Sequence, residues 1–174
     1  MKNCVANLAD LMDRQMALLM DSKFNNGLTD NLSGASEERR TINHGFKAVQ
    51  IGASAWTAEA LKNTMPASVF SRSTECHNQD KVSMGTIAAR DCIRVLELTE
   101  QVAAAELLAV YQALEIRLRS EEIDLEVLSP EIAGMREQVF SKFEFLTEDR
   151  PLEGDLREMV SLIQGREWAL YSAK

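Results

Sequence analysis

Cysteine, proline and glycine are all scarce in this chain of 174 residues, which contains 3, 3 and 8 of them respectively. The cysteines are Cys4, Cys76 and Cys92. An odd number without CxxC spacing argues against a disulfide framework and against a zinc site, and a reducing cytoplasmic location fits this usage best. The glycines are scattered, which excludes a glycine-rich phosphate loop and a nucleophile elbow.

The chain also lacks an excess of basic residues and any long uninterrupted apolar segment. Its net charge is −8, and residues 121–174 hold 13 acids against 6 bases, so we expect no nucleic-acid partner. The first apolar stretch contains Asp10 and Asp13, and the most apolar later stretch is broken by Glu106. These charges predict that the chain has neither a signal peptide nor a membrane-spanning helix.

What the chain does have is apolar residues at steps of three and four positions, the spacing that lines one face of a helix. The first such face comprises Val5, Leu8, Met12, Met16 and Leu19, and the second comprises Ile42, Phe46, Val49, Ala53, Trp56 and Ala60. No segment alternates for long in the strand pattern. With 45 % hydrophobic residues, the chain is long enough for one buried core, so we expect a single helical domain over residues 1–174.

The sequence therefore predicts an all-α bundle of about five helices with one long central helix. Signals at the helix ends support this division, because Ser36 can cap a helix, Ser129 before Pro130 is a strong helix start, and Gly165 interrupts a helix before Trp168 and Tyr171. The predicted helices span about residues 3–20, 37–65, 81–119, 130–146 and 151–163.

The densest polar cluster, ECHNQD from Glu75 to Asp80, lies in the loop before the long helix. Such groups are costly to bury unless each is hydrogen-bonded. One interpretation is a structural network that caps the helix, with Asp80 as the cap, and the other is a built functional site. His44, by contrast, has no second ligand at helical spacing, so we interpret it as a surface or core histidine.

The residues around this cluster resemble a known family. The segment MPASVFSRSTECHNQDKVSMGTIAARD, residues 65–91, is similar to the carboxy-terminal half of the aromatic amino acid ammonia-lyases and aminomutases. HNQD at 77–80 resembles the same motif of phenylalanine and tyrosine ammonia-lyases, and residues 81–90 and 97–114 resemble the helix that follows it, also in histidine ammonia-lyases. With LADLMDRQMALLMD at 8–21, the resemblance covers most of residues 8–115, which is only the later part of a longer family chain.

The resemblance assigns roles within the cluster. Gln79 lies where histidine ammonia-lyases carry a glutamate and where phenylalanine and tyrosine enzymes carry glutamine. A buried carboxylate can pair with an imidazole, but beside a phenyl ring the cost of removing it from water is not compensated. Gln79 therefore favours a phenylalanine- or tyrosine-type substrate. Glu75 matches an acidic residue near the substrate amine, where it would orient an ammonium or relay its proton. His77 and Asn78 would bind substrate or support the loop, and we favour support.

The family's cofactor cannot come from this chain. Family members form methylidene imidazolone from an internal Ala-Ser-Gly triplet, and glycine suits the strained cyclisation. Here the three Ala-Ser pairs continue with Glu37, Ala55 and Val69. The family's tyrosine base also lies upstream, and Tyr111 and Tyr171 do not match its context. We therefore expect no cofactor and no metal within this sequence.

Two hypotheses of different classes remain. In the first, the chain is the carboxy-terminal part of an ammonia-lyase for phenylalanine- or tyrosine-type amino acids, less favourably histidine, or of a related aminomutase. In the second, it is a noncatalytic helical module for oligomerisation. The resemblance implies self-association through helices as a dimer or tetramer, and an aromatic amino acid as substrate once the site is complete.

The missing triplet leads to a direct prediction. We expect the isolated chain to deaminate neither phenylalanine nor tyrosine nor histidine, because it carries no electrophile to capture the substrate amine. The purified protein should form no cinnamate or coumarate above a blank in an ultraviolet absorbance assay. Detectable product from the chain alone would show that the triplet argument is wrong.

Overall fold

The computed structural model describes residues 1–168, and its regular elements are helical. The five α-helices are α1 (Lys2–Met20), α2 (Lys47–Lys62), α3 (Gly85–Arg119), α4 (Pro130–Phe140) and α5 (Glu153–Gly165). Short 3-10 helices lie between them at Asp30–Leu32, Glu37–Ile42, Ala67–Phe70 and Leu125–Val127. The prediction of an all-α fold with one long central helix is confirmed.

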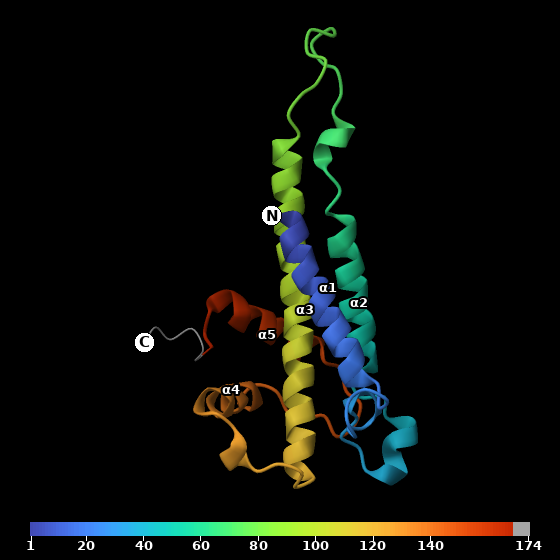
Figure 1. The fold of residues 1–174 in the computed structure, drawn as a ribbon, viewed down its shortest axis with the longest axis vertical. Helices are drawn as coiled ribbons and strands as arrows, with labels where there is room; N and C mark the ends of the chain where they lie inside the picture. Colours follow the sequence, from blue (N-terminus) through green and yellow to red (C-terminus); the bar gives the residue numbers. More distant parts are fainter. Residues whose placement is uncertain (169–174) are drawn as a thin grey trace.

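Three helices form an elongated bundle that the other two cross. α1, α2 and α3 pack against one another, and α3 runs through most of the length of the molecule (Figure 1). In this view α4 and α5 extend from α3 to the left, whereas α2 lies to its right. None of the helices within residues 1–168 is long and apolar enough to cross a membrane.

The buried face of α1 differs from the predicted one. Ala6, Ala9 and Met16 are completely buried, whereas Leu8 is 56 % exposed. The predicted apolar face, which included Leu8, is therefore rotated by part of a turn. The distance between packed helices depends on the side chains at the contact, and alanines let the backbones come close, so the alanine face is the one that packs.

The prediction of one continuous helix after Ser36 is wrong. Glu37–Ile42 is a 3-10 helix without a side-chain cap from Ser36, and α2 begins only after Phe46. Gly45 adopts a φ of +54°, and a Cβ at this position would lie 2.5 Å from the carbonyl oxygen of Asn31. The backbone N–H of Phe46 donates to that same oxygen at 2.8 Å. The chain thus turns back against the preceding loop before α2 can start.

The long helix α3 begins later than predicted, at Gly85 instead of residue 81. Residues 81–84 are not helical, because they return the chain from the loop that precedes α3. Asp80 is therefore not a helix cap, and no side chain caps the start of α3. The polar cluster therefore does not lie at the positive end of α3.

Of the two carboxy-terminal helices, α4 ends earlier than predicted and α5 ends where its glycine predicts. α4 ends at Phe140 instead of residue 146, and the chain then turns so that Phe143 and Leu146, each 2 % exposed, enter the core. α5 ends at Gly165, as predicted, and Trp168 beyond it is buried. Tyr171 lies outside the described residues.

A single buried amide joins three segments of the chain. Gln112 on α3 is 0 % exposed, and its Nε2 donates to the carbonyl oxygens of Leu32 (3.2 Å) and Leu146 (2.9 Å). Its Oε1 accepts from the N–H of Leu146 at 3.0 Å. Buried backbone groups need partners, so this amide determines where the loops before α2 and after α4 meet α3.

A buried carboxylate attaches α4 to α3. Glu115 accepts hydrogen bonds from Nε of Arg119 (2.9 Å) on its own helix and Nε of Arg136 (3.0 Å) on α4. Burial alone would raise the pKa of Glu115, but the hydrogen bonds and charges of the two guanidinium groups outweigh it, and the pKa is lowered. The carboxylate is therefore ionised at neutral pH and holds α4 in place.

Glu106, also on α3, is a half-buried carboxylate without such stabilisation. Burial raises the pKa of Glu106 to about 7, and the charge of Asp13 on α1 adds to this effect. Its Oε2 atom is buried without a hydrogen-bond partner among the described residues. Asp13, in contrast, is ion-paired with Arg14 and accepts from Ser54 Oγ at 2.6 Å. Of the two carboxylates, Glu106 is the one that opposes folding when ionised.

We predict that Gln112→Leu lowers the free energy of unfolding by about 2–4 kcal/mol, because it leaves buried backbone groups of two loops unpaired. Urea denaturation would measure the loss. The matched control is Gln101→Leu, on the same helix at the edge of a groove, which should change stability by less than about 0.5 kcal/mol. Equal losses in the two variants would contradict this role of Gln112.

We predict that Glu106→Gln stabilises the protein at pH 8 but not at pH 4. A folded pKa of about 7, above the ordinary 4.5, means that the folded state retains a proton which the unfolded state has lost, so stability falls as pH rises through this window. The expected gain at pH 8 is about 1–2 kcal/mol after allowance for partial solvent screening. Urea denaturation at both pH values would measure it. Glu97→Gln, at an exposed position of α3 where the carboxylate accepts from Arg94, is the matched control and should not stabilise the protein at pH 8.

Candidate functional site

The predicted site residues lie on a projection that we call the arm, residues 63–84, between α2 and α3. The arm extends beyond the ends of the bundle helices and turns back at its far end (Figure 1). Lys2 fixes its base, since its Nζ donates to the carbonyl oxygen of Met65 (2.8 Å) and forms an ion pair with Asp91 (3.1 Å). The arm therefore starts from a fixed point between α1 and α3.

The end of the arm, residues 74–79, is a tight turn that we call the tip. The backbones of Thr74 and Gln79 exchange two hydrogen bonds, of 3.0 and 3.3 Å, and the N–H of Asn78 donates to the carbonyl oxygen of Glu75 at 2.9 Å. Glu75, Cys76 and His77 all have positive φ values, of 53°, 52° and 66°. Left-handed backbone is costly for residues with a Cβ, and three in succession make this a strained turn.

The side chains at the tip are partly tied to one another. Ser73 Oγ lies 2.9 Å from Nδ1 of His77, and Thr74 Oγ1 donates to Oε1 of Gln79 at 3.5 Å. The structure thus brings His77, Asn78 and Gln79 onto one turn with Glu75, which neighbours Thr74 in the closing pair. All residues from 72 to 81 are exposed. The predicted site residues are held in place, but no part of the described chain encloses them.

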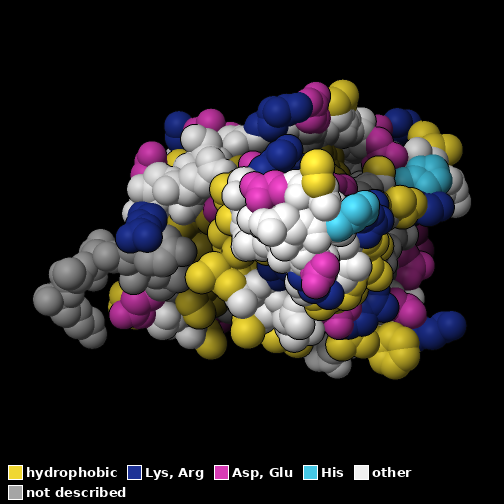
Figure 2. All heavy atoms as spheres, turned by 90° about the horizontal axis from the view of Figure 1, so that it is seen from above, with side chains coloured by type: hydrophobic (Ala, Val, Ile, Leu, Met, Phe, Trp, Pro, Cys, Tyr) yellow, Lys and Arg dark blue, Asp and Glu magenta, His cyan; other side chains and the backbone are white. Residues whose placement is uncertain are grey.

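Seen from above, onto the end of the arm, acidic, basic, histidine and hydrophobic side chains are mixed, with no field of one charge (Figure 2). Among residues 1–168 there is no group of three or more His, Cys, Asp and Glu side chains that could hold a metal ion. His44 lies elsewhere, with Nδ1 at 3.5 Å from Asp149. Cys4, Cys76 and Cys92 are free thiols. The chemistry available at the tip is therefore that of a carboxylate, a thiol, an imidazole and two amides.

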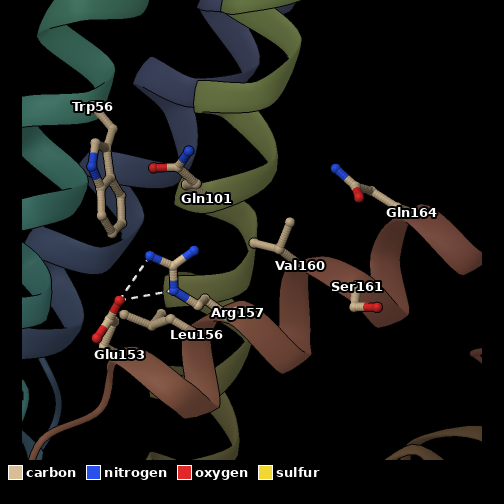
Figure 3. Close-up of a pocket in the computed structure, with 8 residues that line it drawn as sticks. All are labelled: Trp56, Gln101, Glu153, Leu156, Arg157, Val160, Ser161 and Gln164. Carbon is tan, nitrogen blue, oxygen red and sulfur yellow. Dashed lines mark hydrogen bonds and ion pairs between the residues drawn. The ribbon is translucent and has the colours of Figure 1, made fainter.

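A groove of about 350 Å³ lies far from the tip, between α2, α3 and α5. Trp56 faces across it toward α5, and Glu153 and Arg157 of α5 pair with each other at 2.7 Å (Figure 3). Both charged side chains are largely exposed, so this pair contributes little. The groove contains none of the predicted site residues, and we do not assign the functional site to it.

Sequence reasoning did not single out the residues that fasten the arm. Ser71, Ser73 and Thr74 form hydrogen bonds across or within it, and the only sequence signal was their clustering just before Glu75. The guanidinium of Arg72 donates to the carbonyl oxygens of Phe70 and Ser71, next to these hydroxyl residues. Small hydroxyl residues before a turn are too common to be recognised as anchors without the structure.

Comparison with known proteins identifies the family. Residues 1–140, which include α1, α2, the arm and α3, match the model of the aromatic amino acid lyases. The chain belongs to this family. The arm and its tip lie inside the matched residues, whereas α5 lies beyond them.

Relatives with different substrate names are almost equally similar. The chain is 36 % identical to a tyrosine ammonia-lyase of Cereibacter sphaeroides over 90 % of its length, and 34 % identical to a histidine ammonia-lyase of Natranaerobius thermophilus over 95 %. A solved tyrosine aminomutase from Streptomyces globisporus superposes with a TM-score of 0.84 at 30 % identity, over 95 % of this chain. The chain spans 29 %, 31 % and 30 % of these three proteins, less than a third of each.

Proposed function

We propose that this chain supplies the Glu75 and Gln79 side of the active site of an aromatic amino acid ammonia-lyase or aminomutase. The observation that carries the proposal is the tip itself, a strained turn held by hydrogen bonds and presented in full exposure beyond the bundle. Strained polar turns are typical of functional sites. Because nothing in residues 1–168 encloses the tip, the remaining walls of the site would come from another polypeptide segment.

Gln79 is proposed to contact the aromatic ring of a phenylalanine- or tyrosine-type substrate. A neutral amide can lie beside a phenyl or phenol ring without the desolvation cost of a carboxylate. The amide also offers both a donor and an acceptor to a phenol hydroxyl. Support for a phenylalanine or tyrosine type, over histidine, comes from this residue, since the relatives bear both names.

Glu75 is proposed to act on the amino group of the substrate. As a carboxylate it would orient an ammonium ion and accept a proton from it. His77 and Asn78 are proposed to support the turn, His77 through its ring contact with Ser73 and Asn78 through its backbone bond to Glu75. These contacts link each supporting residue to the conformation of Glu75.

The electrophilic cofactor of the family does not fit the residues present. Ser54 lies in the middle of α2, where the following backbone N–H belongs to the helix, and Ser68 lies within the 3-10 helix Ala67–Phe70 before the bulky Val69. Neither position has the glycine that cyclisation favours. The cofactor would therefore belong to the segment that completes the site, and no step of its chemistry is assigned to this chain.

A noncatalytic oligomerisation module is a second candidate, and exposed apolar residues favour it. Leu8, Leu11 and Leu18 of α1 are 56 %, 56 % and 53 % exposed and lie along one side of the helix, and contiguous exposed apolar surface is typical of interaction sites. Self-association as a dimer or tetramer belongs to both candidates. If the chain is part of an enzyme, the residues at the tip do not favour the ammonia-lyase reaction over the aminomutase reaction, or the reverse. Product analysis would distinguish the two, because a lyase forms an aryl acrylate and an aminomutase forms a β-amino acid.

Complementation distinguishes the two candidates. We predict that mixing the chain with a separately expressed upstream fragment, carrying the triplet and the tyrosine base, restores aryl acrylate or β-amino acid formation. Glu75→Ala and Gln79→Glu should each lower turnover of phenylalanine or tyrosine by about tenfold or more, as expected when a group that acts in the transition state is lost. Product formation is followed by absorbance and chromatography.

Matched controls for this experiment lie outside the arm. Glu121→Ala and Gln101→Glu make the same changes at an exposed loop and at the groove, and both should leave turnover within about twofold of the unsubstituted mixture. Failure to restore any activity, while the two fragments form a complex by light scattering, would favour the noncatalytic module.

A further inference from the structure

The two limbs of the arm are joined at a second level below the tip, by a side chain. Ser71 Oγ accepts from the backbone N–H of Val82 at 2.8 Å and donates to the carbonyl oxygen of Val82 at 2.9 Å. Ser71 and Val82 each lie three residues further from the tip than Thr74 and Gln79. Both connections therefore keep the two limbs in the same register, and we call the Ser71–Val82 connection the clasp.

The clasp lies where the arm is still partly shielded from water. Ser71 and Val82 are half-buried, whereas every residue from 72 to 81 is exposed. Hydrogen bonds that are shielded from solvent are stronger than exposed ones, because water competes less for donor and acceptor. Beyond the clasp, among the described residues, the backbones of the two limbs are hydrogen-bonded to each other only within the tip, at Thr74–Gln79 and Glu75–Asn78.

The tip needs this support because of its own conformation. Three consecutive left-handed residues, 75–77, persist only when their surroundings hold them. An isolated pair of short strands is marginally stable in water. The side chain of Ser71 holds both backbone groups of one residue on the returning limb, and so it limits how far the limbs can separate.

We propose that Ser71 is a positioning residue, which holds Glu75 and Gln79 in their working geometry through the clasp. The proposal rests on the proposed function for the catalytic importance of those two residues, but the clasp itself can be tested without it. Ser71 does not act on the substrate. Its effect passes through the backbone of the arm to the tip.

The first test measures the mobility of the tip in the full chain by NMR. In Ser71→Ala, solvent exchange of the backbone amides of Asn78 and Gln79 should rise by about tenfold, because the limbs separate more often. Ser71→Thr keeps the hydroxyl and should behave as the unsubstituted chain. Ser83→Ala is the matched control, since Ser83 Oγ accepts only a local bond from the N–H of Gly85 at 3.2 Å. Unchanged exchange in Ser71→Ala would overturn the proposal.

The second test measures turnover in the complemented mixture. Ser71→Ala should lower kcat by about tenfold with a smaller change in KM, because misplaced groups fail chiefly in the transition state, and Ser71→Thr should restore it. If Ser71→Ala loosens the tip but leaves kcat unchanged while Gln79→Glu lowers it, the positioning role is overturned and the proposed function stands. If Gln79→Glu also leaves turnover unchanged, both fail, whatever the exchange measurement shows of the clasp.

Discussion

The end of the bundle opposite the arm depends on Gln112, which pairs buried backbone groups of two loops. Two loops that are distant in the sequence, around Leu32 and Leu146, meet α3 at this one amide. Leu32 ends a short 3-10 helix and Leu146 lies outside the helices, so the carbonyl group of each needs a partner other than a helical N–H group. By anchoring these loops, Gln112 also fixes the turn that starts α2 and the turn that ends α4. α3 is thus held by Gln112 near its carboxy-terminal end, and by the ion pair of Asp91 with Lys2 near its amino-terminal end, where the arm joins it.

The arm extends this rigid support to a group of polar residues in solvent. Lys2 binds its base to α3, the Ser71–Val82 clasp joins its limbs, and the Thr74–Gln79 pair closes its tip. Such a succession of contacts is more than a flexible connection requires. Within the described residues, this ordered and strained turn is fully exposed, and the chain spans less than a third of the relatives it matches.

The periodicity of apolar residues predicted the helices well and their ends poorly. α1 lies where the spacing predicts a helix and α5 ends at Gly165, although the buried face of α1 is rotated from the predicted one. Ser36 and Asp80 were each expected to cap a helix, and neither does. After Ser36, the close approach of Gly45 to Asn31 turns the chain, so the α-helix starts only after Phe46. At Asp80 the chain is still returning from the tip. Neither cause can be recognised from the residue types at Ser36 and Asp80 alone.

The sequence by itself determined the helical class and the long central helix, and its resemblance, with HNQD at 77–80, indicated the family and suggested the residues of the candidate site. These follow from local spacing and residue type, which a single stretch of chain contains. Only the tertiary structure decided that Glu75 and Gln79 stand on an exposed tip, that Ser71 joins the limbs below them, and that Gln112 unites two loops. Each of these depends on which distant backbone groups come within hydrogen-bonding distance, and packing alone brings them together.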